Sequence, residues 1–370
     1  MNKMKLVVAK PSVAAFKRDM ASSIKSLDDI AHEFGITRGV NKVNKDLEID
    51  FGLQLILFDK HLESLEEIKE GVLSSTQGIP LSVHAPYNYG DEADWPRTDL
   101  SRGSQGLDNL KRVAEFSRDI GALSVAVHPN AIRTKEELKD PSRYNPRTQQ
   151  EFLNEVISHV QEVNSQYGGI IDLENKPLPA TTADNENPIF TTVFHPISHL
   201  EYYIGKGGTL TFDTCHYGIT RETINGAIKR LGSGLTDEVL REQEMLGYFA
   251  KDFVYQPSIE DAMLRLGSAI NHIHLNDGSV YRTVEETGLQ DRTKKLPMVG
   301  GYQLWWEAYV PGKGELCKTD CIKPWLTKHQ ADDRTVTLTL EVTEFNKDYA
   351  NNPRWKESTR DALTIIYSLR

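Results

Sequence analysis

The sequence predicts a single (β/α)8 barrel, an α/β fold in which eight parallel strands alternate with helices. Short apolar runs of strand length alternate with segments of helical periodicity, which is typical of βα units. Six of these runs close on or near a His, Asp or Glu, and the carboxyl ends of barrel strands meet on one face. A chain of 370 residues accommodates one barrel with inserted loops and an extra helix on the catalytic side.

The first half of the barrel is predicted from apolar runs separated by helical patterns. We expect strands at 5–9, 52–58, 81–84 and 124–128, and helices at 24–34, 62–73 and 106–120. The third helix is the clearest, because Leu107, Leu110 and Val113 fall on one side and Gly121 follows its last turn.

The second half repeats the pattern with longer insertions. We expect strands at 170–174, 209–213, 271–275 and 336–342, and helices at 148–167, 197–204, 235–249, 258–266, 321–329 and 355–368. One of the two helices between residues 235 and 266 is an insertion. Segments 177–196 and 278–309 show no clear strand and are predicted as long loops over the catalytic face, the second as a lid.

Residues 1–370 are predicted to form one domain, because no linker, low-complexity segment or change of composition divides them. An open doubly wound sheet is the alternative, but no Gly-x-Gly-x-x-Gly turn follows the first strand. The formal net charge of −10 disfavours a nucleic-acid partner, which requires a basic stripe.

The sequence also indicates a cytoplasmic location. Its three cysteines, Cys215, Cys317 and Cys321, are too few for a disulfide framework, which fits a reducing compartment. Cys317 and Cys321 have a zinc-like spacing but lack a second pair. The apolar run near the amino terminus is too short for a secretory signal, and no run reaches the ~20 residues of a membrane span.

Four residues at strand ends predict a metal site. Glu174, Asp213 and Glu341 each close an apolar strand, where a carboxylate is costly to bury unless it is paired or metal-bound. Each alone is equally explained by a hydrogen bond or a salt bridge. Together with His274 on a fourth strand, they predict a shared divalent cation. His272 lies on the same strand face, but His274 is nearer the carboxyl end, so we assign His274 to the metal and His272 to the core.

Three further histidines follow strand ends. His84 and His128 close the third and fourth strands and are candidates for a second cation, with Glu174 as the bridging carboxylate. His216 lies just after Asp213 and is a candidate for ligation, substrate orientation or proton donation. Neighbouring Cys215 invites a nucleophile hypothesis, but an inert packed thiol is the more ordinary interpretation.

Two residues are candidates for substrate binding. Trp306, next to Trp305 in the second long loop, is placed to line a pocket, although such aromatic pairs more often only pack. Lys313, in a Pro-Gly-Lys-Gly-Glu turn, is placed to meet an anionic group of a substrate, and a solvated surface lysine explains it equally well.

The strand-end motifs, taken in order, resemble the xylose isomerase-like TIM barrel superfamily, in its sugar phosphate isomerase/epimerase and endonuclease IV branch. The matching fragments are His-Ala-Pro-Tyr from His84, Val-His-Pro around His128, Leu-Glu-Asn around Glu174, Phe-Asp-Thr-Cys-His from 212 to 216, His-Ile-His-Leu-Asn-Asp from 272 to 277, Pro-Gly-Lys-Gly from 311 to 314, and Leu-Glu-Val around Glu341. Each fragment alone is weak, but their order is specific for the superfamily.

The resemblance implies that Glu174, Asp213, His274 and Glu341 bind one divalent metal, with His216 near the substrate. In the endonuclease IV branch, the equivalents of His84 and His128 join Glu174 on a first zinc. A third zinc there requires an Asp-x-His pair before the glycine turn, and this chain has Trp-Trp-Glu-Ala-Tyr-Val at 305–310 instead. A trinuclear phosphodiesterase centre is therefore not expected.

The leading hypothesis is a metal-dependent isomerase or epimerase that transfers a proton through an enediolate of a sugar, with Glu174 and Glu341 as acid and base. The cofactor is a divalent metal (Mn, Zn, Mg or Co), with iron as an alternative, and the partner is a small-molecule carbohydrate. A two-metal hydrolase that cleaves a phosphodiester or related bond is the second hypothesis. An oxygenase or lyase, a catalytically silent barrel and a homo-oligomeric assembly stay open.

Overall fold

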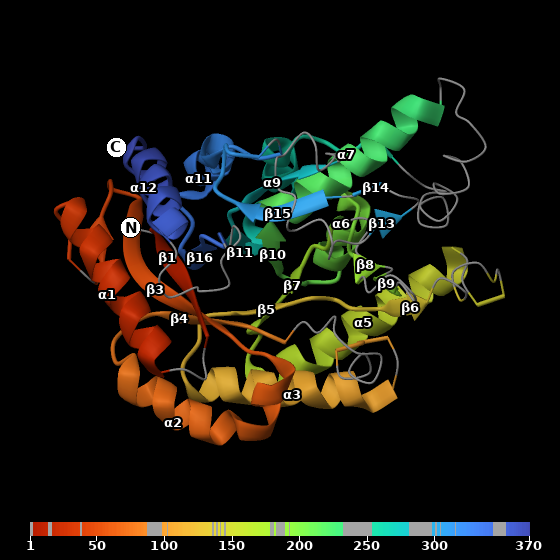
Figure 1. Cartoon of the computed structure of the whole chain (residues 1–370), viewed down its shortest axis with the longest axis horizontal. Helices are drawn as coiled ribbons and strands as arrows, with labels where there is room; N and C mark the ends of the chain where they lie inside the picture. The colour runs from red at the N-terminus through yellow and green to blue at the C-terminus, as the bar shows by residue number, and fades with distance from the viewer. Residues whose placement is uncertain are drawn as a thin grey trace.

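A computed structural model shows strands at the centre of the molecule and helices around them (Figure 1). It describes the chain except for residues 1–2, 14–16, 38, 87–97, 102, 135–136, 138–139, 141, 144–145, 178–180, 183–188, 192, 232–253, 281–297, 300–301, 304, 315 and 343–352. In the described part, no helix has the length and apolar character needed to cross a membrane.

Eight parallel strands form a closed barrel, which confirms the predicted fold class. They are β1 (Met4–Val13), β3 (Leu47–Ile56), β4 (Leu81–His84), β5 (Val125–Val127), β7 (Ile171–Glu174), β10 (Leu210–Asp213), β11 (Ile270–His274) and β16 (Arg334–Thr339). The barrel closes because β1 pairs in parallel with both β3 and β16. A short strand, β2 (Asn41–Lys42), pairs antiparallel with β3 outside the ring.

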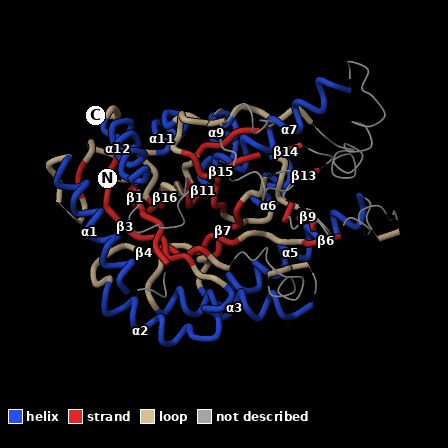
Figure 2. The backbone as a smooth tube through the Cα atoms, viewed as in Figure 1, coloured by secondary structure: helices blue, strands red, loops and turns tan. Residues whose placement is uncertain are grey.

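Helices surround this barrel, as the outer blue layer of Figure 2 shows. They are α1 (Lys17–Glu33), α2 (Leu65–Ser75), α3 (Gly103–Asp119), α5 (Pro146–Tyr167), α6 (Ile197–Gly205), α7 (Thr214–Leu231), α9 (Ile259–Leu266), α11 (Lys323–His329) and α12 (Pro353–Tyr367), with 3₁₀ turns η1 (Asp59–Ser64), η3 (Gly267–Ala269) and η5 (Thr319–Ile322). A continuous apolar cluster joins strands and helices, and it includes Leu53, Val72, Val113 and Val160.

The register between β10 and β11 sets the height of the site residues. The pairing shifts after Leu210, so that Thr211 lies opposite His272 and Asp213 lies opposite His274. A bulge of this kind re-aims the side chains that follow it. Asp213 and His274 therefore reach the same rim from neighbouring strands.

The two segments that we predicted as loops contain short strands, so that part of the prediction is wrong. Within 177–196, β8 (Thr181–Thr182) and β9 (Ile189–Thr191) form an antiparallel sheet with β6 (Ile132–Thr134). Within 278–309, β12 (Asp277–Val280) pairs with β15 (Trp305–Tyr309), and β13 (Met298–Val299) pairs with β14 (Tyr302–Gln303). Strands this short show no measurable alternation of apolar and polar residues, and only their pairing reveals them.

Helix α7 begins directly after β10 and was missed in the sequence. Its β-branched residues and glycines weaken the helical pattern, so tertiary packing decides its conformation. The helix predicted at 235–249 lies outside the described residues. The last strand ends at Thr339, three residues earlier than predicted, which leaves Glu341 two residues beyond β16.

Candidate metal centre

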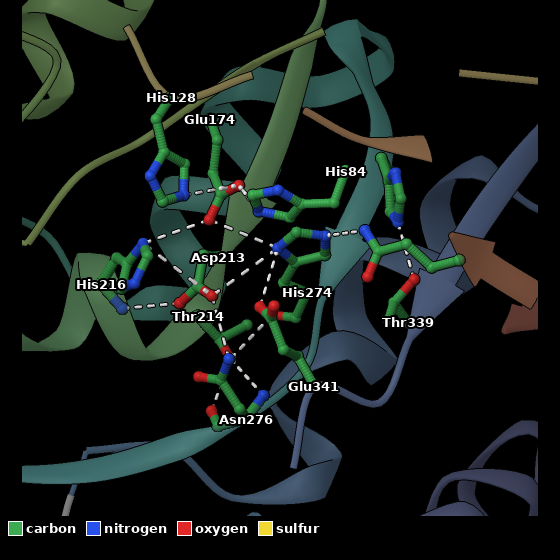
Figure 3. Close-up of polar contacts among 12 residues, drawn as sticks. His84, His128, Glu174, Asp213, Thr214, His216, His274, Asn276, Thr339 and Glu341 are labelled. Carbon is green, nitrogen blue, oxygen red and sulfur yellow. Dashed lines mark hydrogen bonds and ion pairs between the residues drawn. The ribbon is translucent and has the colours of Figure 1, made fainter. Parts of the chain in front are cut away.

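Four candidate ligands converge at the carboxyl ends of four barrel strands (Figure 3). Glu174, Asp213 and His274 are the last residues of β7, β10 and β11, and Glu341 follows β16. One potential ligand atom from each of the four lies within 4.8 Å of the others. Parallel strands of a barrel produce this convergence because they all end on the same face.

His274 is at the centre of the group. Its Nδ1 lies 3.1 Å from an Oε2 of Glu341, 3.3 Å from Oε1 of Glu174 and 3.9 Å from Oδ2 of Asp213. The side chains of His274, Glu174 and Asp213 are fully buried, whereas that of Glu341 is 17% exposed. The centre therefore opens to solvent on the side of Glu341.

The donor set fits a divalent cation. Both carboxylate oxygens of Glu174 and Nδ1 of His274 are buried and have no hydrogen-bond partner within the described part of the chain. Buried polar atoms of this kind are rare unless a ligand or ion satisfies them. Three carboxylates and one imidazole suit Mn, Mg, Co or Zn, so the residues present fit the metal that the motifs implied.

The electrostatics of the group are those of a site that attracts a cation. Burial by itself raises the pKa of Glu174, but the imidazoles of His128 and His274 outweigh burial and hold this pKa well below its usual value. Burial by itself lowers the pKa of His274. The carboxylates of Glu341 and Glu174 outweigh burial, so this pKa lies well above its ordinary value. Burial also raises the pKa of Asp213 to about 6. A positive charge at this point is therefore strongly favoured.

Neighbouring polar side chains hold the four ligands in place. The carboxamide nitrogen of Gln54, Nε2, lies 2.6 Å from Nε2 of His274. Asp213 receives a hydrogen bond of 2.9 Å from Asn276 Nδ2 and one of 2.7 Å from the backbone N–H of His216. Supporting contacts of this kind fix the orientation of metal ligands and tune their affinity.

His272 has different neighbours from His274, in keeping with the assignment made from strand position. Its Nδ1 lies 3.2 Å from Ser124 Oγ and its Nε2 lies 2.8 Å from Thr339 Oγ1. Burial lowers the pKa of His272 well below its ordinary value, so its ring is neutral and serves as a hydrogen-bonding core residue.

His84 and His128 reach the other oxygen of Glu174. Their Nε2 atoms lie 3.4 Å and 3.3 Å from Oε2, and the two rings contact each other edge to face. His84 also forms a potential ligand group with Glu174 and His274. The structure thus places both histidines against Glu174, and of the two only His84 belongs to a group of potential ligands in the described chain. Their role in holding a second cation remains a prediction.

His216 lies in the first turn of α7, next to the centre. Its Nδ1 is 2.9 Å from the carbonyl oxygen of Asn175 and 3.3 Å from Glu174 Oε1. The hydrogen bond to a carbonyl requires a proton on Nδ1, which leaves Nε2 as the acceptor nitrogen of the neutral ring. Cys215, which precedes it, packs in a buried cluster with Ile219 and Leu316.

The other two candidates stand apart from these contacts. Lys313 is half exposed, and its Nζ lies 3.4 Å from Glu357 Oε1 of α12. Its turn is anchored by Asp277, which accepts backbone N–H bonds of 3.0 Å from Gly312 and 2.8 Å from Gly314. Trp306 belongs to β15, and its side chain lies outside the described part of the structure. Their roles in substrate binding remain predictions.

Sequence reasoning missed Gln54, Asn276 and Lys176. Lys176 is 2% exposed, and its Nζ lies 2.7 Å from Nδ1 of His128. Burial, and then the positive charge of the Lys176 ammonium group, lower the pKa of His128 well below its usual value. Lys176 and Asn276 each lie two residues beyond a predicted ligand, a position that sequence inspection alone could have flagged.

Comparison with known proteins supports the fold. No family model and no curated protein matches the sequence. A 3-keto-D-glucoside 4-epimerase from E. coli is similar in structure, with a TM-score of 0.50 and 14% identity over 98% of this chain and 100% of that one. An L-ribulose 3-epimerase gives a TM-score of 0.51 and 11% identity over 100% of this chain and 96% of that one. The chain therefore shares with these two epimerases the fold of an eight-stranded parallel α/β barrel.

Proposed function

We propose that this protein is a divalent-metal-dependent isomerase or epimerase that acts on a sugar or sugar-like substrate. One observation carries the proposal: four ligand atoms from four strand ends lie within 4.8 Å of one another, and two of the residues, Glu174 and Glu341, flank the same imidazole. The similar epimerase structures agree with this assignment at the level of fold.

The proposed reaction moves a proton on carbon. A divalent cation in the centre would supply positive charge that stabilises the oxygen anions of an enediolate. One of Glu174 and Glu341 removes the proton beside the substrate carbonyl, and the other returns it. Glu341 is the more exposed carboxylate and lies where the centre opens to solvent. The pKa of Glu174 lies well below its usual value beside His274, so Glu174 is deprotonated, as a base must be.

His216 would assist from the wall of the centre. The contacts of its Nδ1 with Asn175 and Glu174 fix the ring, so its orientation is set before a substrate arrives. With its Nδ1–H held by Asn175, the neutral ring accepts a hydrogen bond from a substrate hydroxyl through Nε2, and pre-organisation of this kind lowers the barrier to proton transfer.

Proton exchange with solvent tests this function directly. The protein is incubated with Mn²⁺ and a panel of free and phosphorylated ketoses in D₂O, and deuterium on carbon is followed by NMR. We expect exchange in the native protein and a loss of at least ~10²-fold in Glu174→Gln and in Glu341→Gln, because each removes a proton-transfer group.

Glu201→Gln is the matched control, because Glu201 pairs with Arg265 on the surface. It should exchange at the native rate. Native rates of exchange in both active-centre variants, with circular dichroism showing an intact fold, would remove this mechanism.

A metallohydrolase is the second candidate function. The observation that favours it is the approach of His84 and His128 to Glu174 Oε2, which places two imidazoles beside a carboxylate that could bridge two ions. The number of bound ions separates the two functions: about one per chain favours proton transfer, and about two favour hydrolysis.

A further inference from the structure

We propose that Lys176 limits the centre to one divalent ion. Its ammonium group donates a hydrogen bond to Nδ1 of His128, which leaves the ring proton on Nε2, the nitrogen that would otherwise bind an ion. The inference rests on the metal centre of the proposed function. It assigns to Lys176 a positioning role that decides how many ions bind. It also decides between the two functions that the ligand set leaves open.

The hydrogen-bond chemistry of His128 carries the first step. An ammonium group has three donors and no acceptor, so the 2.7 Å contact from Lys176 Nζ makes Nδ1 of His128 the acceptor. A neutral imidazole carries its proton on the other nitrogen, which is then Nε2. This is the atom that lies 3.3 Å from Glu174 Oε2, so His128 presents an N–H and not a lone pair to the centre.

Ligation by His128 would reverse this arrangement. A metal-bound imidazole uses the lone pair of one nitrogen and normally donates the N–H of the other to an acceptor. With a metal on Nε2, the N–H on Nδ1 would face the ammonium donors of Lys176 instead. Two donors that point at each other form no hydrogen bond, and this contact is buried on both sides.

His84 is the internal comparison, because its ring is set the opposite way. Its Nδ1 lies 2.7 Å from the carbonyl oxygen of Ala85, which can only accept, so Nδ1 carries the proton. The lone pair of Nε2 then faces Glu174 Oε2 at 3.4 Å. His84 is therefore prepared for ligation, and His128 is not.

Lys176 is held rigidly enough to maintain this block. Its backbone N–H donates to the carbonyl oxygen of Phe194 at 3.0 Å, and its own carbonyl accepts from Thr220 Oγ1 at 3.1 Å. The side chain is almost completely buried. These contacts fix the main chain from which the buried ammonium group reaches His128.

The ligand count follows from these contacts. Without His128, a second ion beside His84 would have Glu174 and His274 as its other protein ligands within the described chain, and both also belong to the group with Asp213 and Glu341. A second ion would therefore have to share two of its three ligands with the first, which leaves it fewer than three of its own. Catalytic sites of this kind normally provide three protein ligands. One ion at Glu174, Asp213, His274 and Glu341 is therefore the expected occupancy.

Titration of metal-free protein with Mn²⁺ tests the inference without any assay of activity. The variant Lys176→Met removes the ammonium group and keeps a chain of similar length, and Lys176→Arg keeps a charged donor. Isothermal titration gives the number of ions, and electron paramagnetic resonance distinguishes an isolated Mn²⁺ from a coupled pair. We expect about one ion in the native protein and in Lys176→Arg, and about two coupled ions in Lys176→Met.

A second variant keeps the test decisive. Lys176→Met combined with His128→Ala should return to one ion, because the second ion depends on the released imidazole. Two ions in the native protein, or one ion in a folded Lys176→Met, would overturn the inference. Failure of the proposed function looks different: the native protein would bind its single ion and show no exchange of substrate protons in D₂O.

Discussion

At the scale of single residues, the centre depends on the contacts that fix the orientation of each side chain. His274 illustrates this, since carboxylates surround its Nδ1 and Gln54 contacts its Nε2. In the structure the carboxamide nitrogen of Gln54 faces Nε2 of His274 at 2.6 Å. A ring that binds metal through Nδ1 carries its proton on Nε2, and the carboxamide of Gln54 then turns over so that its oxygen accepts this proton. Gln54 thus orients the ligand without touching the ion.

Replacing Gln54 tests this orienting role. In Gln54→Leu, the Nε2–H of His274 loses its acceptor, and we expect the dissociation constant for Mn²⁺ to rise about 10- to 100-fold. Isothermal titration measures the change. Gln330→Leu is the control, because Gln330 bonds to Asn44 away from the centre. Equal affinities in the native protein and Gln54→Leu would show that the ring is oriented by other contacts.

At the scale of elements, the ends of strands and the turns that follow them carry the chemistry. The 3₁₀ turn η1 shows how such a turn depends on protonation. Nδ1 of its buried His61 accepts the backbone N–H of Phe58 at 3.0 Å, which only a neutral ring can do. Burial, and then the charge of Lys60, lower the pKa of His61 in the folded protein.

This contact predicts how stability depends on pH. Because folding lowers the pKa of His61, its contribution to stability is complete above the unfolded-state value of about 6.5 and is lost as the pH falls below it. In His61→Asn, which keeps an acceptor that does not titrate, the free energy of unfolding should change less between pH 7.5 and 5. The reduction should be about 1.4 kcal/mol for each unit of lowered pKa.

Urea denaturation at the two pH values measures this difference. His32→Asn, at an exposed position on α1, is the control for replacement of a histidine outside this turn. The same slope in the native protein and His61→Asn would mean that His61 does not contribute to acid sensitivity.

At the scale of the whole molecule, a cation bound at the barrel rim links four strands that are far apart in sequence. The ligands come from β7, β10, β11 and the end of β16, and these strands are neighbours in the barrel. An ion that binds the folded state alone stabilises it, by about 2.7 kcal/mol when its concentration is one hundred times its dissociation constant.

Removal of the metal should therefore lower the unfolding temperature. We expect a chelator to reduce the unfolding temperature of the native protein by several degrees, and Mn²⁺ to restore it. Asp213→Asn, which weakens the ligand set, should respond much less to either treatment. Differential scanning calorimetry measures both proteins, and an identical response would place the stabilising ion elsewhere.

Much of the fold could be predicted because strand-end residues and barrel strands leave strong local patterns. Glu174 and His274 close buried apolar runs, so their strands and their convergence were readable. The short pairs β8–β9 and β12–β15 were not, because two to five residues carry too little periodicity. Helix α7 was hidden by residues whose intrinsic preference for helix is weak.

The sequence by itself determined the barrel and the identity of its rim residues, because both follow from the order of apolar runs and the chemistry of the residues that end them. Both His84 and His128 face Glu174 through Nε2, and only the tertiary structure decided whether that nitrogen presents a lone pair or an N–H. The carbonyl of Ala85 orients His84 one way, and Lys176 orients His128 the other. Such choices depend on neighbours brought together by folding, and a linear chain contains no local signal for them.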